Sequence, residues 1–531
     1  MKKRNALLSV YHKEGITEFA RELINLGFTI YASGGTAKHI AAGGVEVIDV
    51  ATLVGGGSIL GHRVVTLSRE IHSGLLATEA QREELVRLGI PWLDLVCVDL
   101  YPLSQEIARE GSTLESVIEQ TDIGGPTMLR SAAKGQRIVI CDPTDRDRVL
   151  NWLKAGEPNE GVFLETLCAK AEYICGEYCM TSATYRSGGR YAGIFGERVA
   201  TCKYGENAWQ APAHLYGTET DDPLALDKFT VVEGTPPSYN NWCDLDRLLQ
   251  TMTHIVAVLS NNNREVPFIA LGCKHGNVCG AALSFDTRFV LQKMMAGDPL
   301  AIFGGLVMTN FAIVDDEVAD VLSGKMLDGI VTPGFTGDTI ARLRRKGDKC
   351  RFITNPALHQ LRGVSDGETF MDRTPRFRYV RGGFLRQPNY TFVLNLFDSR
   401  LQKFGHESSQ RRSDILLAWA IGSTSNSNTV TLVKDDKLIG NGVGQQDRVG
   451  AAKLAIERAT RSGHIINNAV AYSDSFFPFP DGPQVLIDAG VRTILTSSGS
   501  IKDQLTIDLC RERGVALYMI PDSVGRGFFG H

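Results

Sequence analysis

The sequence predicts an α/β protein with two or more domains, and three observations lead to this prediction. The chain has 531 residues, more than one hydrophobic core usually supports. Over roughly the first 130 residues, apolar runs alternate with segments of helical periodicity, the order typical of a parallel sheet covered by helices. A glycine-rich irregular stretch lies near residue 200, and α/β patterning resumes beyond it.

The elements of the first part follow in order from the same two patterns. Short apolar runs predict strands at 5–11, 28–35, 45–50 and 92–102. Apolar residues at helical spacing predict helices at 15–27, 36–44 and 161–187. Ligands of parallel sheets bind beyond the carboxyl ends of the strands, where the chain has SVYHK (9–13), ASGGT (32–36) and DLYP (99–102).

The second part shows the same α/β character. An apolar strand at 266–275 runs into a Lys-His pair, and 491–500 forms a second strand-to-loop junction. We place the domain boundary so that residues 1–198 form the first domain and 199–531 the second.

The composition excludes several classes of partner. Hydrophobic residues make up 43% and charged residues 22%, and the formal net charge of −4 provides no basic field for nucleic acid. No apolar run approaches the ~18 residues of a membrane span. The 11 cysteines are scattered, and Cys175 and Cys179 lack the companion ligands of a zinc site. We therefore expect free thiols in a cytoplasmic protein, with no metal, no nucleic acid and no membrane contact.

The stretch KHGNVCG (274–280) places Lys274 and His275 side by side at a strand end. Histidine titrates near neutrality and suits proton transfer, and a neighbouring lysine can stabilise an oxyanion or lower the pKa of the histidine. Adjacent strand residues point to opposite sides, so both can serve one substrate only where the chain twists, which Gly276 and Gly280 permit. The alternative is a strand-end histidine beside a solvated lysine.

Other polar stretches suit an anionic ligand. ASGGT can turn backbone N–H groups and a helix N-terminus toward a phosphate, although a plain tight turn explains it equally well. The stretches 61–74 and 121–135 contribute further charges and hydroxyls, namely Arg63, Thr66, Asp122 and Lys134. Tyr101 can join them around a ligand, with solvated helix charge as the alternative.

The stretch SDSFFPFPD (473–481) has three phenylalanines and two prolines between aspartates. This composition predicts a rigid aromatic wall with an acid at its rim. Such a wall suits a flat heteroaromatic ring, whose N–H groups the carboxylate can bond. An ordinary core strand followed by a turn is the alternative.

Together these stretches resemble the bifunctional purine-biosynthesis family that joins AICAR transformylase to IMP cyclohydrolase. The resemblance is collinear over nearly the whole chain, through SVYHKEG, ASGGTAK, LYP, DIGGPTMLRSAAK, KYGEN, SYNNWCDLD, KHGNVCG, DPLAIFGG, DGIVTPG, SNSN, GVGQQDR, SDSFFPF and the final FGH. Each motif alone is weak evidence, and a dozen in one order are specific.

The resemblance implies a methylglyoxal-synthase-like parallel-sheet domain that closes the purine ring. It also implies a larger transformylase region of two cytidine-deaminase-like α/β units without catalytic zinc. The implied reactions are formyl transfer from the co-substrate 10-formyltetrahydrofolate to the 5-amino group of AICAR, then closure of formyl-AICAR to IMP with loss of water. The family is a homodimer with its transformylase sites between subunits.

For formyl transfer, the resemblance implies that His275 takes the amine proton, Lys274 holds the protonation state of that histidine, and Asn428 bonds the formyl oxygen. Contacts to phosphate and ribose are implied for Lys203, Tyr204, Asn241, Asp328, Arg448 and Arg526. Contacts to the imidazole carboxamide are implied for Phe303 and Gly304. Contacts to folate or neighbouring substrate atoms are implied for Phe476, Pro478, Phe479 and Asp481.

For ring closure, the resemblance implies proton handling by Tyr101, Asp122 and Lys134. The implied nucleotide-phosphate cradle consists of Ser9, Lys13, Ser33, Gly34, Thr36, Arg63 and Thr66.

The sequence departs from the family pattern at Val65 and Ser68, where a lysine and a histidine are usual. Valine can neither carry charge nor donate a hydrogen bond from its side chain. Two alternative functions therefore stay open. One is formyl transfer alone, with a degenerate cyclohydrolase domain, and the other is a non-catalytic nucleotide- or folate-binding scaffold.

Overall fold

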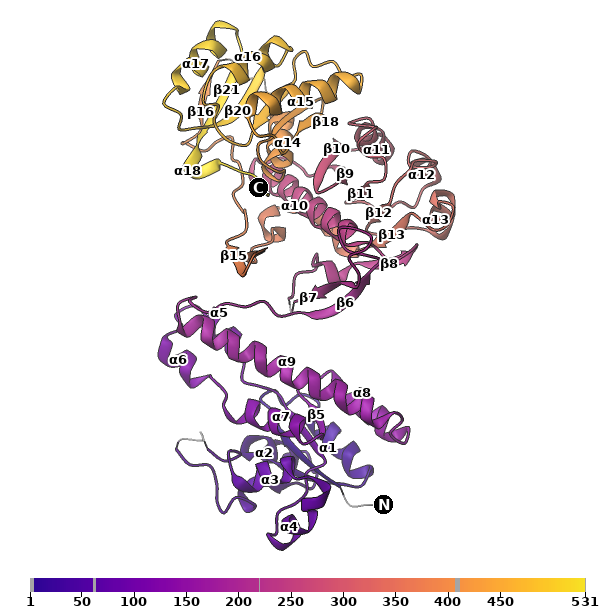
Figure 1. Ribbon diagram of the computed structural model, residues 1–531, viewed down its shortest axis with the longest axis vertical. Helices are drawn as coiled ribbons and strands as arrows, with labels where there is room; N and C mark the ends of the chain where they lie inside the picture. The colour runs from indigo at the N-terminus through magenta and orange to yellow at the C-terminus, as the bar shows by residue number, and fades with distance from the viewer. Residues whose placement is uncertain (1–3, 61–63, 219, 406–410, 531) are drawn as a thin grey trace. The chain divides into compact units, whose positions relative to one another are not determined.

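The computed structural model describes residues 4–60, 64–218, 220–405 and 411–530. The chain divides into two compact units, Met1–Phe195 and Gly196–His531 (Figure 1). Each unit is built around its own sheet, and the predicted α/β class is confirmed for both.

The smaller unit contains a five-stranded sheet in the order β3-β2-β1-β4-β5, and every neighbouring pair is parallel. The strands are β1 (Arg4–Ser9), β2 (Phe28–Ala32), β3 (Ile48–Asp49), β4 (Leu95–Val98) and β5 (Ile138–Ile140). The helices are α1 (Ile16–Asn25), α2 (Gly34–Ala42), α3 (Arg69–Leu76), α4 (Arg82–Arg87), α5 (Leu103–Ala108), α6 (Leu114–Glu119), α7 (Gly124–Lys134), α8 (Asp145–Lys154) and α9 (Glu160–Arg186).

Helix α9 shows how the pattern produces this unit. Its buried residues Leu167, Cys168, Ala171 and Cys175 recur every three or four positions and form one stripe. That stripe packs against α7 and β5, while the rest of the helix is polar or half-buried. Burial of Cys175 agrees with the packing role expected for it, and Cys179, one turn further, is exposed.

The larger unit contains a twelve-stranded mixed sheet in the order β16-β21-β20-β19-β17-β18-β10-β9-β11-β12-β13-β8. Its first half contains β8 (Thr230–Glu233), α10 (Tyr239–Asn261), β9 (Phe268–Lys274), β10 (Asn277–Ser284), α11 (Thr287–Met295), β11 (Leu306–Thr309), α12 (Asp316–Asp320), β12 (Gly329–Thr332), α13 (Gly337–Leu343) and β13 (Arg351–Thr354). Its second half contains β16 (Gln402–Phe404), α14 (Arg412–Ser423), β17 (Val430–Lys434), β18 (Lys437–Gly442), α15 (Arg448–Arg461), β19 (Val470–Ser473), α16 (Asp481–Asp488), β20 (Thr493–Ser498), α17 (Asp503–Glu512) and β21 (Ala516–Pro521).

The two halves repeat one order of elements, and they meet where β10 pairs antiparallel with β18. Each half starts with an edge strand, continues with a buried helix and a β-hairpin, and then alternates helices with three parallel strands. Two smaller hairpins lie outside this repeat, formed by β6 (Glu197–Cys202) with β7 (Ala213–Gly217) and by β14 (Arg376–Val380) with β15 (Gly383–Gln387). The short helix α18 (Asp522–Gly525) leads into the C-terminal tail.

Helices α10 and α14 pack against each other in the core of the larger unit. His254 of α10 is buried there, its ring stacked on Tyr390 at 5.6 Å between centroids and close to Trp419. Its Nδ1 lies 2.7 Å from the carbonyl oxygen of Gln250. Burial lowers the pKa of His254 to about 4, because a charged imidazole would lose its hydration.

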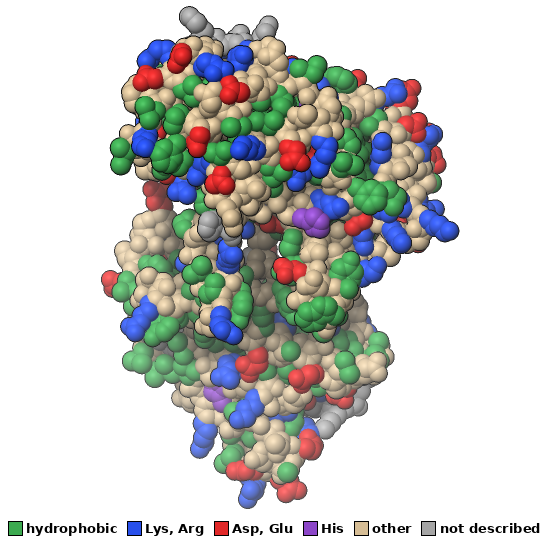
Figure 2. Space-filling model, turned by 45° about the horizontal axis from the view of Figure 1, so that its top comes forward, with side chains coloured by type: hydrophobic (Ala, Val, Ile, Leu, Met, Phe, Trp, Pro, Cys, Tyr) green, Lys and Arg blue, Asp and Glu red, His purple; other side chains and the backbone are tan. Residues whose placement is uncertain are grey.

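Figure 2 shows acidic and basic side chains interspersed over the viewed face. Among the described residues, no helix is long and apolar enough to cross a bilayer.

The buried histidine gives the first prediction. Because the unfolded chain binds this proton near pH 6.5 and the folded chain only near pH 4, folding stability falls as the pH drops through that window. Between pH 7 and pH 5 this group alone removes about 2 kcal/mol of unfolding free energy. Urea denaturation at both pH values should show a smaller loss for His254→Phe than for the wild type. Replacing the exposed His39 by phenylalanine should leave the loss unchanged, and an equal loss for His254→Phe would contradict the assignment.

Candidate functional sites

The first candidate site lies at the carboxyl edge of the five-stranded sheet. Ser9 ends β1 and Ser33 precedes α2, and their hydroxyl oxygens are 2.8 Å apart. Thr36 accepts a hydrogen bond from the Val10 N–H and donates one to the Val10 carbonyl, both at 3.2 Å. A side chain added at Gly34 would meet no atom within 4 Å. The predicted cradle residues Ser9, Ser33, Gly34 and Thr36 therefore lie together, with open space at Gly34 and the Thr36 hydroxyl buried against Val10.

Asp99 fixes the loop that follows β1. Its carboxylate accepts hydrogen bonds from the backbone N–H groups of Tyr11 and His12. The ammonium group of Lys13 donates to the carbonyls of Val10 and Tyr11, and burial lowers its pKa. Lys13 thus lies beside the cradle, as predicted, with Asp99 as its neighbouring negative charge.

Tyr101 and Asp122 meet at the same edge. Burial raises the pKa of both, and the Asp122 carboxylate further raises that of the Tyr101 phenol. Asp122 accepts a hydrogen bond from the Gly125 N–H at 2.8 Å, at the start of α7. Thr66 adjoins Gly124, because a Cβ built there would lie 2.8 Å from its hydroxyl oxygen. A phenol, a carboxyl group and a buried hydroxyl are therefore neighbours at this edge.

One predicted member lies away from this site, and another falls outside the described residues. Lys134 is exposed at the last position of α7, and Asp122 precedes the first position, so about 15 Å of helix separates them along the axis. Arg63 lies outside the described residues.

Val65 and Ser68 have structural roles in this chain. Val65 packs against the core of the smaller unit. Ser68 is the N-cap of α3, and its hydroxyl accepts a hydrogen bond from the Ile71 N–H at 3.2 Å. Neither side chain offers the charge of the lysine or the imidazole that the family pattern has there.

The second candidate site starts at the turn between β9 and β10. His275 and Gly276 both have positive φ, 54° and 69°, the geometry of a two-residue hairpin turn. The carboxylate of Asp244, on α10, accepts the Gly276 N–H at 2.6 Å, and Asn277 donates to the His275 carbonyl at 3.1 Å. His275 is exposed at this turn.

The structure corrects the role expected for Gly280. It lies within β10 and not in the turn. The pairing of β10 with β9 is irregular next to this glycine. A Cβ there would approach the Met294 carbonyl to 2.6 Å, so glycine allows close packing of α11. The turn that presents the Lys-His pair is formed by residues 275 and 276, which both have positive φ.

Lys274 points away from the turn toward the loop before β11. Its ammonium group donates to the carbonyl oxygen of Phe303 and lies 5.9 Å from the centre of that ring. Gly304 has φ 74°, and a Cβ there would be 3.6 Å from the ammonium and 4.0 Å from an Asp328 carboxylate oxygen. The predicted residues Lys274, Phe303, Gly304 and Asp328 therefore form one group.

A hydrogen bond ties the turn to the second half of the unit. The Asn277 side-chain oxygen accepts the backbone N–H of Asn426 at 3.3 Å. Two residues further, Asn428 donates from its backbone and its side chain to the Gln445 carbonyl, at 3.1 and 2.9 Å. The Lys-His turn and the Asn428 loop are thus neighbours within one chain.

The C-terminal tail holds this loop from the other side. The guanidinium groups of Arg376 and Arg247 lie 3.4 and 4.8 Å from the centre of the Phe529 ring. Phe529 donates its N–H to Ser425, and Gly530 accepts the Ser427 N–H, each at 3.0 Å. Arg526 lies at the start of the same tail, with its guanidinium 3.7 Å from Asp522.

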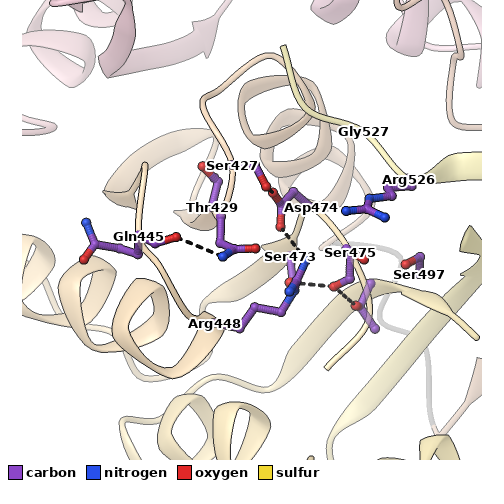
Figure 3. A network of polar contacts seen from close by, with 12 residues as sticks. Ser427, Thr429, Gln445, Arg448, Ser473, Asp474, Ser475, Ser497, Arg526 and Gly527 are labelled. Carbon is purple, nitrogen blue, oxygen red and sulfur yellow. Dashed lines mark hydrogen bonds and ion pairs between the residues drawn. The ribbon is translucent and has the colours of Figure 1, made fainter. Parts of the chain in front are cut away.

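A polar cluster joins the tail to α15, and Figure 3 shows it. Arg448 is the first residue of α15, and its guanidinium is 3.6 Å from the buried carboxylate of Asp474. Asp474 also accepts a hydrogen bond from the Ser427 hydroxyl at 2.6 Å. Burial lowers the pKa of Arg448, and Arg526 nearby lowers it further. Sequence analysis missed both Asp474 and Ser427 as site residues.

The aromatic wall is only partly as predicted. Phe477 packs in the core behind β17–β21 and cannot face a ligand, so only Phe476 and Phe479 remain available. Phe479 is half exposed, with the Lys502 ammonium 4.1 Å from its ring centre. Ser500 donates to the Pro478 carbonyl at 3.4 Å, and Asp481 is exposed at the start of α16.

The remaining predicted residues lie at the start of α10. The Asn241 side chain completes a capping box with Ser238, accepting its N–H at 3.0 Å, and is buried. Tyr204 accepts the Tyr239 N–H at 3.0 Å through its carbonyl, and Lys203 is exposed next to it. The capping role occupies the Asn241 side-chain oxygen.

A cavity of about 340 Å³ opens beside His275. It is bounded by Lys274 and His275 at the turn, Leu300 on the loop before β11, and Arg458 and Arg461 on α15. Asp298 lines the same cavity and pairs with Arg458 at 2.9 Å. In the part of the chain that the structure describes, no group of histidine, cysteine, aspartate and glutamate side chains could hold a metal ion.

A nucleotide-type cradle on one sheet and a Lys-His turn facing an amide loop on another define a two-domain enzyme acting on small anionic substrates. The chain belongs to the family of the AICARFT/IMPCHase bienzyme, whose model matches residues 132–458, and an MGS-like domain model matches 15–127. A curated bifunctional purine biosynthesis protein PurH from Anoxybacillus flavithermus is 34% identical, over 97% of this chain and 98% of its own. The PurH of Aquifex aeolicus is 30% identical over 96% and 98%. A solved structure titled "Crystal structure of ForH" covers 36% of this chain and 100% of its own, at 34% identity and a TM-score of 0.32.

The capping of the hairpin turns gives the second prediction. Asp414 of α14 accepts the N–H groups of Asp435 and Asp436 at the turn after β17, as Asp244 accepts that of Gly276. Removing either acceptor leaves turn N–H groups without a partner, which costs about 1–3 kcal/mol. Urea denaturation should therefore show a loss of this size for both Asp244→Ala and Asp414→Ala. Wild-type stability in both variants would contradict the capping role.

Proposed function

We propose that this chain transfers a formyl group from 10-formyltetrahydrofolate to the 5-amino group of AICAR and then closes formyl-AICAR to IMP with loss of water. Residues 199–531 form the transformylase and residues 1–198 the cyclohydrolase. One observation carries the proposal: the exposed His275 turn is bonded through Asn277 to the loop of Asn428 and opens on a cavity of about 340 Å³.

In formyl transfer, His275 accepts the proton of the 5-amino group as its nitrogen attacks the formyl carbon. The second side-chain N–H of Asn428 donates to the formyl oxygen as negative charge develops on it. The bond from the formyl carbon to the folate nitrogen then breaks, and that nitrogen takes up a proton. Lys274 keeps a positive charge beside Phe303 and Gly304, where the imidazole carboxamide binds.

Further residues of matching chemistry are assigned to the anionic and flat parts of the substrates. Arg448 and Arg526 bind the phosphate, helped by Lys203 and Tyr204, while Asn241 and Asp328 support the ribose side. Phe476, Pro478, Phe479 and Asp481 hold folate or neighbouring substrate atoms. The family's homodimer in the cytoplasm, with transformylase sites between subunits, belongs to the same proposal.

In ring closure, the carboxamide nitrogen attacks the formyl carbon and water leaves. Asp122 and Tyr101, both with raised pKa values, exchange the protons of these steps. Ser9, Ser33, Gly34 and Thr36 bind the phosphate, with Lys13 and Thr66 at its rim. Lys134 acts on this site only indirectly, because the structure places it at the far end of α7.

A narrower function keeps a specific observation in its favour. Val65 packs in the core and Ser68 caps α3, so neither supplies a charge to the cyclohydrolase site. Losing one electrostatic contact typically costs on the order of 10²–10³ in rate. Formyl transfer without efficient ring closure is therefore the second candidate.

The third prediction concerns His275. With AICAR and 10-formyltetrahydrofolate supplied, His275→Ala should abolish tetrahydrofolate release, because the amine then has no proton acceptor. Supplied formyl-AICAR should still close to IMP at the wild-type rate, measured by IMP absorbance. The exposed His359→Ala serves as the matched control. Near wild-type formyl transfer by His275→Ala would refute the assignment.

The fourth prediction concerns Tyr101. Replacing it by phenylalanine should lower the rate of formyl-AICAR closure by on the order of 10² and leave formyl transfer intact. The control is Tyr191→Phe, at an exposed tyrosine of the same unit. A wild-type chain that releases tetrahydrofolate without forming IMP would support the narrower function instead.

A further inference from the structure

Asp474 is a buried carboxylate that touches three segments far apart in the sequence. It follows β19, and only 1% of its surface is exposed. One carboxylate oxygen accepts the Ser427 hydroxyl at 2.6 Å, and the other lies 3.6 Å from the Arg448 guanidinium. Its backbone N–H donates to Thr429 at 3.3 Å, and its carbonyl accepts the Gly527 N–H at 3.2 Å. Figure 3 shows these groups converging from different elements.

These three segments carry groups that the proposed reaction uses. Asn428 lies between Ser427 and Thr429, and Asp474 bonds both of them. Arg448 faces Asp474 directly, and Arg526 immediately precedes Gly527. One residue therefore sets the position of the formyl-binding amide relative to both phosphate-binding arginines.

The energetics favour a role beyond packing. A carboxylate at this depth is costly, and burial raises the pKa of Asp474 accordingly. The Ser427 hydroxyl and the positive charges of Arg448 and Arg526 act in the opposite direction. One carboxylate oxygen of Asp474 and Nε of Arg448 have no hydrogen-bond partner within the described chain. A buried charge with incomplete hydrogen bonding lowers the stability of the fold. Such a cost is typical of functional sites, where the geometry of the side chains has to be exact.

We propose that Asp474 is a positioning residue for formyl transfer, which holds Asn428, Arg448 and Arg526 in one arrangement. The inference rests on the proposed function. Asp474 does not touch the reacting atoms; it acts through Ser427, the Arg448 guanidinium and the backbone of residue 527. A displacement of the reacting groups by about 1 Å costs on the order of 10² in rate, so such a residue has a measurable effect.

Two variants separate the contact of Asp474 with Arg448 from its contact with Ser427. Asp474→Asn keeps the size and an acceptor for Ser427 but removes the charge that faces Arg448. It should raise KM for AICAR by about 10-fold and lower kcat of formyl transfer by on the order of 10². Ser427→Ala keeps the charge and frees the Asn428 loop, so it should lower kcat by roughly 10-fold and leave KM for AICAR nearly unchanged.

The same chain supplies the controls. Closure of supplied formyl-AICAR by the smaller unit should stay at the wild-type rate in both variants, which reports on concentration and folding. Asp414→Asn replaces another buried aspartate of the larger unit, away from Asn428, and should leave KM for AICAR unchanged. Should Asp474→Asn fail to fold, Ser427→Ala alone tests the split between kcat and KM.

The outcomes are distinct. Wild-type kcat and KM in Asp474→Asn, or equal losses in Asp474→Asn and Asp414→Asn, would overturn the positioning role while leaving the proposed function intact. Absence of formyl transfer in the wild-type chain would reject the proposed function and this inference with it.

Discussion

The antiparallel pairing of β10 with β18 is the interaction on which the larger unit depends. It joins two halves of equal element order into one twelve-stranded sheet. Because the hairpins meet there, the turn that carries His275 lies beside the loop that carries Asn428, and Asn277 bonds Asn426 across the junction. Without this pairing, His275 and Asn428 would belong to separate sheets. The arrangement that we propose for formyl transfer is therefore a property of the joined halves.

Buried carboxylates then fix the loops at the sheet edges. Asp244 and Asp414 hold the two hairpin turns, and Asp474 holds the loop, the helix start and the tail. Burial raises the pKa of each, to about 6 for Asp414, because their charges are taken out of water. Hydrogen bonds from backbone N–H or hydroxyl groups offset this cost and make each loop conformation specific. The smaller unit uses the same device, since Asp99 binds the loop after β1.

The spacing of apolar residues predicted the fold well where a helix or strand buries one face only. The long helix expected at 161–187 is α9, Glu160–Arg186, because its buried stripe is unbroken. The strand β5, Ile138–Ile140, was not predicted, because an apolar run of three residues is too short to indicate a strand. The turn at His275 followed from Gly276, yet the partner that holds it lies 32 positions away, and Ser427 lies 47 positions from Asp474. Contacts between residues so far apart produce no pattern in the local sequence. The motifs of the candidate site could therefore be predicted, but the residues that hold these motifs in place could not.

The repeat in the larger unit has an evolutionary consequence. The turn equivalent to His275–Gly276 is Asp435–Asp436, which also has positive φ at both positions and the same type of aspartate cap. Lys434 precedes it as Lys274 precedes the first turn, but an aspartate stands where His275 does. In a fused duplication, one copy can lose its reactive groups while the other retains them, a freedom that identical paired subunits lack. The second turn thus has the backbone shape of the first without its histidine. Residues that tolerate a left-handed backbone can be substituted at Asp435 and Asp436 to introduce new reactive side chains. The turn that carries His275 would stay unchanged.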